Sequence, residues 1–180
     1  ISCSLEEEGL VIPPTHLQRA GQADAGVLQR IVDATASPVQ MQGDLAAQLS
    51  ANRAGEQRLA ELAGSSGLGA FKAGLAAVNR YGARLAEEAL AGLPEGRYHF
   101  QDVMDDDGLG SEDIPLAVTL DVRGGEVSVD FTGTAAQVGG NINCPLSVTA
   151  AGVFYVFRCL MPSHTPACAG SFQGIHLTAP

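Results

Sequence analysis

Positive charge is scarce in this sequence. The 180 residues contain 10 Lys and Arg against 20 Asp and Glu, so the net charge is -10 and the isoelectric point is near 4.6. A chain with this balance repels the phosphate backbone of a nucleic acid instead of attracting it. We therefore expect no nucleic-acid partner.

Long apolar runs are also missing. The most apolar stretch, residues 146–160, is shorter than the roughly 18 apolar residues that a membrane-spanning helix needs, and it contains Arg158. No positively charged segment followed by an apolar one opens the chain, as a secretory signal would. These two features predict a cytoplasmic protein without a membrane partner.

The sequence lacks the spacings that bind metals or form disulfide frameworks. Its four cysteines lie too far apart for the CxxC pairs of a structural zinc site, and they lack the dense spacing of a secreted disulfide scaffold. Its four histidines form no HxxH or HxxxH pair. We therefore predict reduced thiols, with Cys159 packed in the interior, and no metal site within these residues.

Hydrophobic periodicity predicts helices in the first half of the chain. Residues 1–40 read as an extended entry segment and a short helix around 27–34, which Pro38 ends. Residues 41–94 predict two amphipathic helices, divided at 64–67 and rich in Ala and Leu. Two such helices are expected to pair as an antiparallel hairpin.

The remaining part, 95–180, is predicted to be rich in strands. Strands are expected at 98–103, 116–122, 126–131 and 173–178, and a buried apolar helix at 145–160. Arg158 is the only charge in that helix, so we expect it to have a carboxylate or carbonyl partner. The predicted fold class is α+β, in which the N-terminal helical hairpin packs with a small, mainly antiparallel sheet and one buried apolar helix.

A polar, Gly-rich segment connects the third strand to this helix. The strand delivers Asp130 to the segment, and Asn141 and Asn143 come just before the helix, which has Pro145 at its first turn. A helix N-terminus presents unpaired backbone donors, so the segment is suited to an anion or a polarised carbonyl. The alternative is that the two asparagines only cap the helix and turn the chain. A thiol beside a helix N-terminus ionises readily, which makes Cys144 a candidate nucleophile, but the sequence identifies no base for it.

A second polar set lies on the helix predicted to begin at Gly43. Asp44, Gln48 and Asn52 recur at intervals of four and therefore share one stripe of the helix. This stripe is either a solvated face, with Asp44 as the N-terminal cap, or the lining of a cleft. The three consecutive aspartates at 105–107 lack the alternating ligands of a calcium loop and read as a solvated turn.

Four stretches in the same order resemble the hydantoinase B/5-oxoprolinase family, the B-type component of ATP-dependent cyclic-amide hydrolases. The stretches are EEEGLVIPP (6–14), GDLAAQLSANRAGEQRL (43–59), YHFQDVMDDDGLG (98–110) and the long segment from DFTGT to CAGSF (130–172). Members of that family are longer, so the chain resembles an internal piece that lacks the family's His- and Asp-rich N-terminal part. The resemblance implies one fragment of a larger domain.

The resemblance also implies roles for individual residues. Asp130, Asn141 and Asn143 are expected to be catalytic. The residues expected to bind substrate or line the cleft are Glu8, Asp44, Gln48, Asn52 and Cys144.

The implied activity is the opening of a cyclic amide such as 5-oxoproline or N-methylhydantoin. An A-type component, as a separate subunit or a fused domain, would phosphorylate the amide oxygen, so ATP with magnesium and a divalent metal belong to the full-length complex, which is a hetero- or homo-oligomer. The chain itself contains no Walker-type loop, and we expect it to hold no cofactor and to be inactive alone. Two alternatives stay open: a subunit of a related ketone carboxylase, and a non-catalytic structural or subunit-interaction module.

Overall fold

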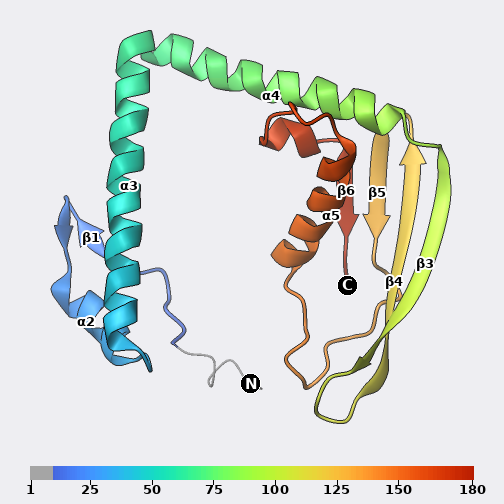
Figure 1. Cartoon of the computed structure of the whole chain (residues 1–180), viewed down its shortest axis with the longest axis horizontal. Helices are drawn as coiled ribbons and strands as arrows, with labels where there is room; N and C mark the ends of the chain where they lie inside the picture. Colours follow the sequence, from blue (N-terminus) through green and yellow to red (C-terminus); the bar gives the residue numbers. More distant parts are fainter. Residues whose placement is uncertain (1–9) are drawn as a thin grey trace. The chain divides into compact units, whose positions relative to one another are not determined.

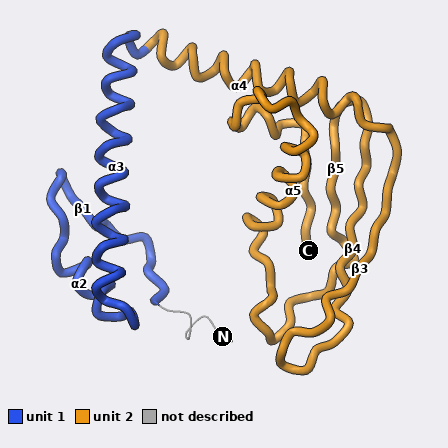
Figure 2. Tube along the Cα trace, in the orientation of Figure 1, with its two compact units in different colours: residues 1–68 blue, residues 69–180 orange. Residues whose placement is uncertain are grey.

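The computed structural model describes residues 10–180, which belong to two compact units, one ending at Leu68 and the other formed by Gly69–Pro180 (Figure 2). In chain order the elements are β1 (Gln18–Arg19), β2 (Gln22–Ala23), α2 (Ala25–Asp33), α3 (Pro38–Ser66), α4 (Leu68–Ala91), β3 (Gly96–Asp106), β4 (Glu112–Arg123), β5 (Glu126–Asp130), α5 (Leu146–Leu160), the 3₁₀ turn η1 (Ala169–Phe172) and β6 (Ile175–Thr178). None of the described helices combines the length and the apolar character needed to cross a membrane.

In the first unit, α2 packs against α3. The side chain of Asp24 caps α2 by accepting a hydrogen bond from the backbone N–H of Val27 at 3.0 Å, and the apolar side chains of Val27 and Ile31 are buried. The short helix predicted here is confirmed. Pro38 does not end it, because α2 stops at Asp33 and Pro38 instead lies at the start of α3. A proline is tolerated there because the first N–H groups of a helix have no partner within it.

Helix α3 begins before its predicted start at Gly43, which changes the role of Asp44. With Ser37 as the capping residue and Pro38 in the first turn, Asp44 lies inside the helix, so its assignment as the N-terminal cap is wrong. The helix ends at Gly67, whose φ of 77° lies in the left-handed region that glycine adopts readily. Because α4 falls in the second unit, the pairing of these helices as a hairpin stays a prediction.

The second unit contains a four-stranded sheet in the order β3-β4-β5-β6 (Figure 1). The first three strands are antiparallel neighbours, and β6 runs parallel to β5 because α5 carries the chain back along the sheet. Gly124 and Gly125, with φ of 57° and 81°, form the tight turn between β4 and β5. All four strands are present where the sequence predicts them, and the α+β class is confirmed.

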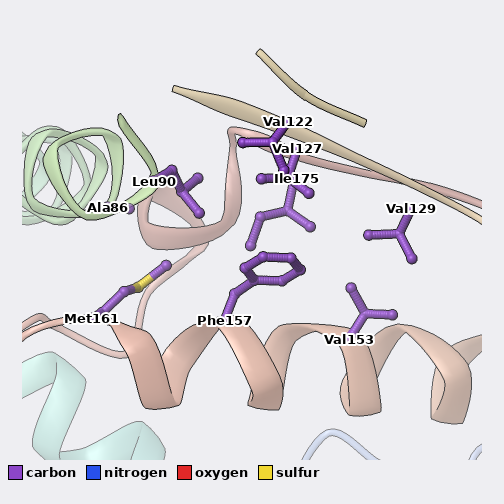
Figure 3. Close-up of a cluster of buried hydrophobic side chains, with 9 residues drawn as sticks. All are labelled: Ala86, Leu90, Val122, Val127, Val129, Val153, Phe157, Met161 and Ile175. Carbon is purple, nitrogen blue, oxygen red and sulfur yellow. The ribbon is translucent and has the colours of Figure 1, made fainter. Parts of the chain in front are cut away.

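The core of this unit lies between one face of the sheet and α5. Period-two alternation places Val122, Val127 and Val129 on the same face, where Phe157 and Val153 of α5 point toward them (Figure 3). Ala86, Leu90, Met161 and Ile175 complete the buried cluster. Residues of β5 with odd numbers thus face α5, and Ser128 and Asp130 face the opposite side.

Helix α5 is buried on one face only, which corrects the prediction of a buried helix. Val153 and Phe157 are buried, but Tyr155 is 71% exposed and Cys159 is also exposed, so the predicted interior packing of Cys159 is wrong. The described residues cover only the sheet-facing side of this helix. Arg158 is partly exposed, and its Nη1 has no hydrogen-bond partner within residues 10–180, contrary to the predicted pairing. Solvent reaches the rest of this side chain, which lowers the cost of leaving the charge unpaired.

Candidate functional site

The candidate site is the segment between β5 and α5, residues 131–145, which we call the site loop. Its first half runs beside β4. The hydroxyl of Thr134 donates to the backbone oxygen of Ala117 and accepts from its N–H, both at 3.0 Å. The N–H of Ala135 donates to the oxygen of Pro115 at 2.9 Å. The loop is therefore fastened to the sheet where it leaves β5.

Asp130 folds back onto this loop. Its Oδ1 accepts hydrogen bonds from the hydroxyl and the N–H of Thr132 at 2.6 and 2.9 Å. These two bonds, with a smaller contribution from the charge of Arg97, lower the pKa of the Asp130 carboxyl. The side chain lies on the sheet face opposite α5, and no hydrogen bond joins it to Asn141 or Asn143 within the described residues. The structure thus shows Asp130 as an ionised carboxylate that shapes the loop entrance.

Asn143 closes the second half of the loop. Its Nδ2 donates to the backbone oxygens of Val138 and Gly140 at 2.8 and 3.1 Å, and its Oδ1 accepts from the N–H of Val138 at 3.0 Å. Both amide hydrogens are therefore engaged inside the loop. Asn143 does not cap α5, whose capping residue is Pro145 with no side-chain hydrogen bond.

Asn141 and Cys144 are the exposed polar groups of this half of the loop. The Asn141 side chain forms no hydrogen bond with the residues that the structure describes, and Cys144 Sγ accepts a bond from the Thr149 hydroxyl at 3.4 Å. No base contacts this thiol in the described part of the chain. Because no side chain caps the first turn of α5, its leading N–H groups remain available directly after these residues.

Asp107 is part of the site although the sequence predicted it to be solvated. Asp105 and Asp106 are exposed as expected, but Asp107 is only 6% exposed. Its Oδ1 accepts from the N–H groups of Leu109 and Ser111 at 2.8 and 2.9 Å, and its Oδ2 accepts from the N–H of Gly140 at 3.1 Å. The backbone donors, Leu109 first and then Ser111, lower the pKa of the Asp107 carboxyl.

The other predicted residues cannot be joined to this loop. Asp44, Gln48 and Asn52 are exposed on α3 in the first unit, so their sharing of a cleft with the site loop stays a prediction. Glu8 lies outside the described residues. Within residues 10–180, no group of three His, Cys, Asp or Glu side chains is arranged to hold a metal ion.

Comparison with known proteins identifies the family. The family model described as hydantoinase B/oxoprolinase matches residues 2–180. The chain belongs to this family. It is 33% identical to 5-oxoprolinase 1 of Arabidopsis thaliana over 76% of its length, and 30% identical over 96% to a protein provisionally named as a component of the D-/L-hydantoinase of Pseudomonas sp. strain NS671. The chain spans only 12% and 31% of these two relatives.

A solved structure supports the fold of this family member. The crystal structure of the ATP-dependent caprolactamase from Pseudomonas jessenii matches 98% of the chain with a TM-score of 0.89 and 24% identity, and the chain covers 30% of it. The fold of the chain is therefore also that of part of this caprolactamase.

Replacing Asn143 with alanine is expected to lower the free energy of unfolding by about 1–2 kcal/mol, because three hydrogen bonds inside the loop are lost and their backbone partners turn to water. Urea denaturation of the chain measures this. Gln137→Ala, at an exposed amide of the same loop, is the matched control and should leave the midpoint unchanged. Unchanged stability of Asn143→Ala, with kcat of the full-length protein reduced 10- to 1,000-fold, would instead support direct action on the substrate.

The lowered pKa values of Asp107 and Asp130 predict a loss of stability in acid. Folding lowers each pKa from the ordinary value of 3.8, so each ionised carboxylate stabilises the fold above that pH and stops doing so as the pH falls through the lowered pKa. The urea midpoint should therefore fall steadily when the pH is stepped from about 5 to about 2. The slope should be shallower in Asp107→Asn, and an equally steep slope in this variant would contradict the role of Asp107.

Proposed function

We propose that this chain provides part of the ring-opening site of a B-type component, in an ATP-dependent hydrolase that acts on a cyclic amide. The observation that carries the proposal is the exposed Asn141 amide directly before the uncapped N-terminus of α5, in a member of this family. The relatives support the substrate class, because 5-oxoprolinase, hydantoinase and caprolactamase are all named for cyclic amides. Compounds of the 5-oxoproline or N-methylhydantoin type are the proposed substrates.

The chemistry of amide opening explains why such a loop is useful. Negative charge develops on the former carbonyl oxygen, or on a phosphate attached to it, when water attacks the carbon. Hydrogen-bond donors fixed in place before the reaction stabilise that charge without further reorganisation. In the proposed site the donors are the Nδ2 of Asn141 and the leading N–H groups of α5. Asn143 and Asp130 hold the loop in shape.

An A-type component is proposed to prepare the ring for attack. Transfer of the γ-phosphoryl group of ATP to the amide oxygen yields ADP and a stronger electrophile. Addition of water to the carbon, cleavage of the C–N bond with protonation of nitrogen, and release of phosphate then complete the hydrolysis. We propose that ATP with magnesium binds the A-type component and that a divalent metal binds elsewhere in the full-length complex. We assign no metal ligand to the described residues.

The proposal is tested with the full-length protein and its A-type component. The assay follows ATP-dependent ring opening of 5-oxoproline and of N-methylhydantoin, with a ketone plus bicarbonate as the third arm. Turnover of a cyclic amide supports the proposal, and ATP-dependent carboxylation of the ketone alone supports the carboxylase alternative. No turnover in any arm favours a non-catalytic interaction module.

The chain of 180 residues by itself is expected to show no ring opening with ATP, because its sequence contains no Walker-type phosphate loop. The measurement is product formation by the purified chain at high enzyme concentration, with the full-length pair as the positive control. Turnover by the chain alone would contradict the proposed division of labour.

A further inference from the structure

Asp107 connects two loops that are distant in sequence. The turn between β3 and β4 contains Asp107, and the site loop contains Gly140, 33 positions later. The bond from the N–H of Gly140 to Asp107 Oδ2 is buried, and it is the contact through which this turn holds the middle of the site loop. The site loop has no charged side chain of its own, so this carboxylate is the charge that fixes its backbone.

The two oxygens of Asp107 serve different purposes. Oδ1 accepts from Leu109 and Ser111 and is sufficient to shape the turn. Oδ2 contributes nothing to the turn and accepts only from Gly140. A turn that needed only local stabilisation would leave Oδ2 in solvent, as an exposed aspartate does. The burial of Asp107 at 6% exposure therefore reflects its contact with the site loop.

Gly140 is shaped for the same contact. A Cβ atom at this position would overlap the backbone oxygen of Asp107 and lie 2.7 Å from its Cβ, so no side chain fits there. The adjacent Gly139 differs, because a Cβ there would meet only Leu109 at 3.9 Å, which is ordinary van der Waals contact. The close approach is thus specific to the residue that donates to Asp107.

We propose that Asp107 is a positioning residue of the ring-opening site. By holding Gly140, it fixes the backbone immediately before Asn141 and so sets where the Asn141 amide lies relative to the N-terminus of α5. This inference rests on the proposed function for its catalytic meaning. The hold on the loop itself is a property of the chain and is measured without activity.

Asparagine at position 107 is the discriminating substitution. An amide has one acceptor oxygen in place of two, so it can serve either the turn or Gly140 but not both, while the shape of the side chain is kept. Gly140→Ala breaks the same contact from the other side. Asp106→Asn and Gly139→Ala are the matched controls, because each makes the same chemical change one residue away, at an exposed position.

The first experiment is amide hydrogen exchange of residue 140 in the full chain, followed by NMR. Asp107→Asn should speed exchange of this amide at least tenfold, while the buried amides of Val127 and Val129 in β5 keep their protection. The two control variants should leave residue 140 protected. Combining Asp107→Asn with Gly140→Ala should cost no more than the larger single change, because both remove one contact. Unchanged protection of residue 140 in Asp107→Asn overturns the proposal.

The second experiment uses the full-length protein with its A-type component. Asp107→Asn should lower kcat on a cyclic amide at least tenfold with a smaller change in KM, as expected when reacting groups are misplaced. A merely structural role would lower stability and leave kcat of the folded enzyme intact, and that result would overturn the proposal. If the wild type opens no cyclic amide, the proposed function fails instead, and the exchange experiment still decides whether Asp107 holds the loop.

Discussion

Replacing Asn141 with alanine is expected to lower kcat of the full-length protein, assayed with its A-type component, by a factor of roughly 10 to 1,000. That is the range observed when one donor to developing negative charge is removed from an enzyme. Thermal stability should be unchanged, because the Asn141 side chain is exposed and makes no hydrogen bond with the described residues. The paired measurement of kcat and Tm for this variant checks both expectations.

The control for this experiment is Gln137→Ala. Gln137 is an exposed amide on the same loop, four positions before Asn141, and it is not part of the proposed site. Its removal should leave both kcat and Tm at the wild-type values. Equal loss of turnover in the two variants would show that the loop tolerates no truncation, and wild-type turnover in Asn141→Ala would end the assignment of this side chain as a donor.

Replacing Phe157 with alanine is expected to lower the free energy of unfolding by about 3–5 kcal/mol, because a large buried ring is lost and a cavity remains. Phe157 is 6% exposed and lies at the centre of the cluster formed by α5 and the sheet (Figure 3). Urea denaturation followed by circular dichroism measures the change. Because α5 begins where the site loop ends, the variant should also loosen the loop.

The matched control is Tyr155→Ala on the same helix. Tyr155 is 71% exposed, so its truncation should change stability by no more than about 0.5 kcal/mol. A loss of several kcal/mol at this position would show that the outer face of α5 is packed in solution. A small loss at Phe157 would contradict the core described here.

The sequence predicted the elements of the sheet well because their cause is local. Alternation of Val127, Ser128, Val129 and Asp130 reports which side of the strand is buried, and Gly124-Gly125 marks the turn. The start of α3 was misplaced because Asp44 resembles a capping residue, whereas the earlier Pro38 determines the first turn. Burial of α5 was overestimated because an apolar composition does not reveal how many faces of a helix are covered.

The site was predicted in outline and missed in its connections. A Gly-rich loop before a helix is visible in the sequence, and so are its asparagines. The direction of the Asn143 amide is not, because it depends on where the backbone at Val138 and Gly140 lies after folding. Asp107 was missed because its partner Gly140 is 33 positions away, and nothing local separates Asp107 from the two aspartates before it. Its only local signal is the Gly108 turn that follows, which brings backbone N–H groups within reach.

The most direct test of the account is glutamate formation from 5-oxoproline by the full-length protein, its A-type component and MgATP, with omission of each in turn. We predict glutamate only when all three are present, and a rate reduced at least tenfold when the full-length protein carries Asn141→Ala. Glutamate formed at the full rate without the full-length protein, or with Asn141→Ala in place of the wild type, would contradict the central claim that the site loop of this chain takes part in opening the ring.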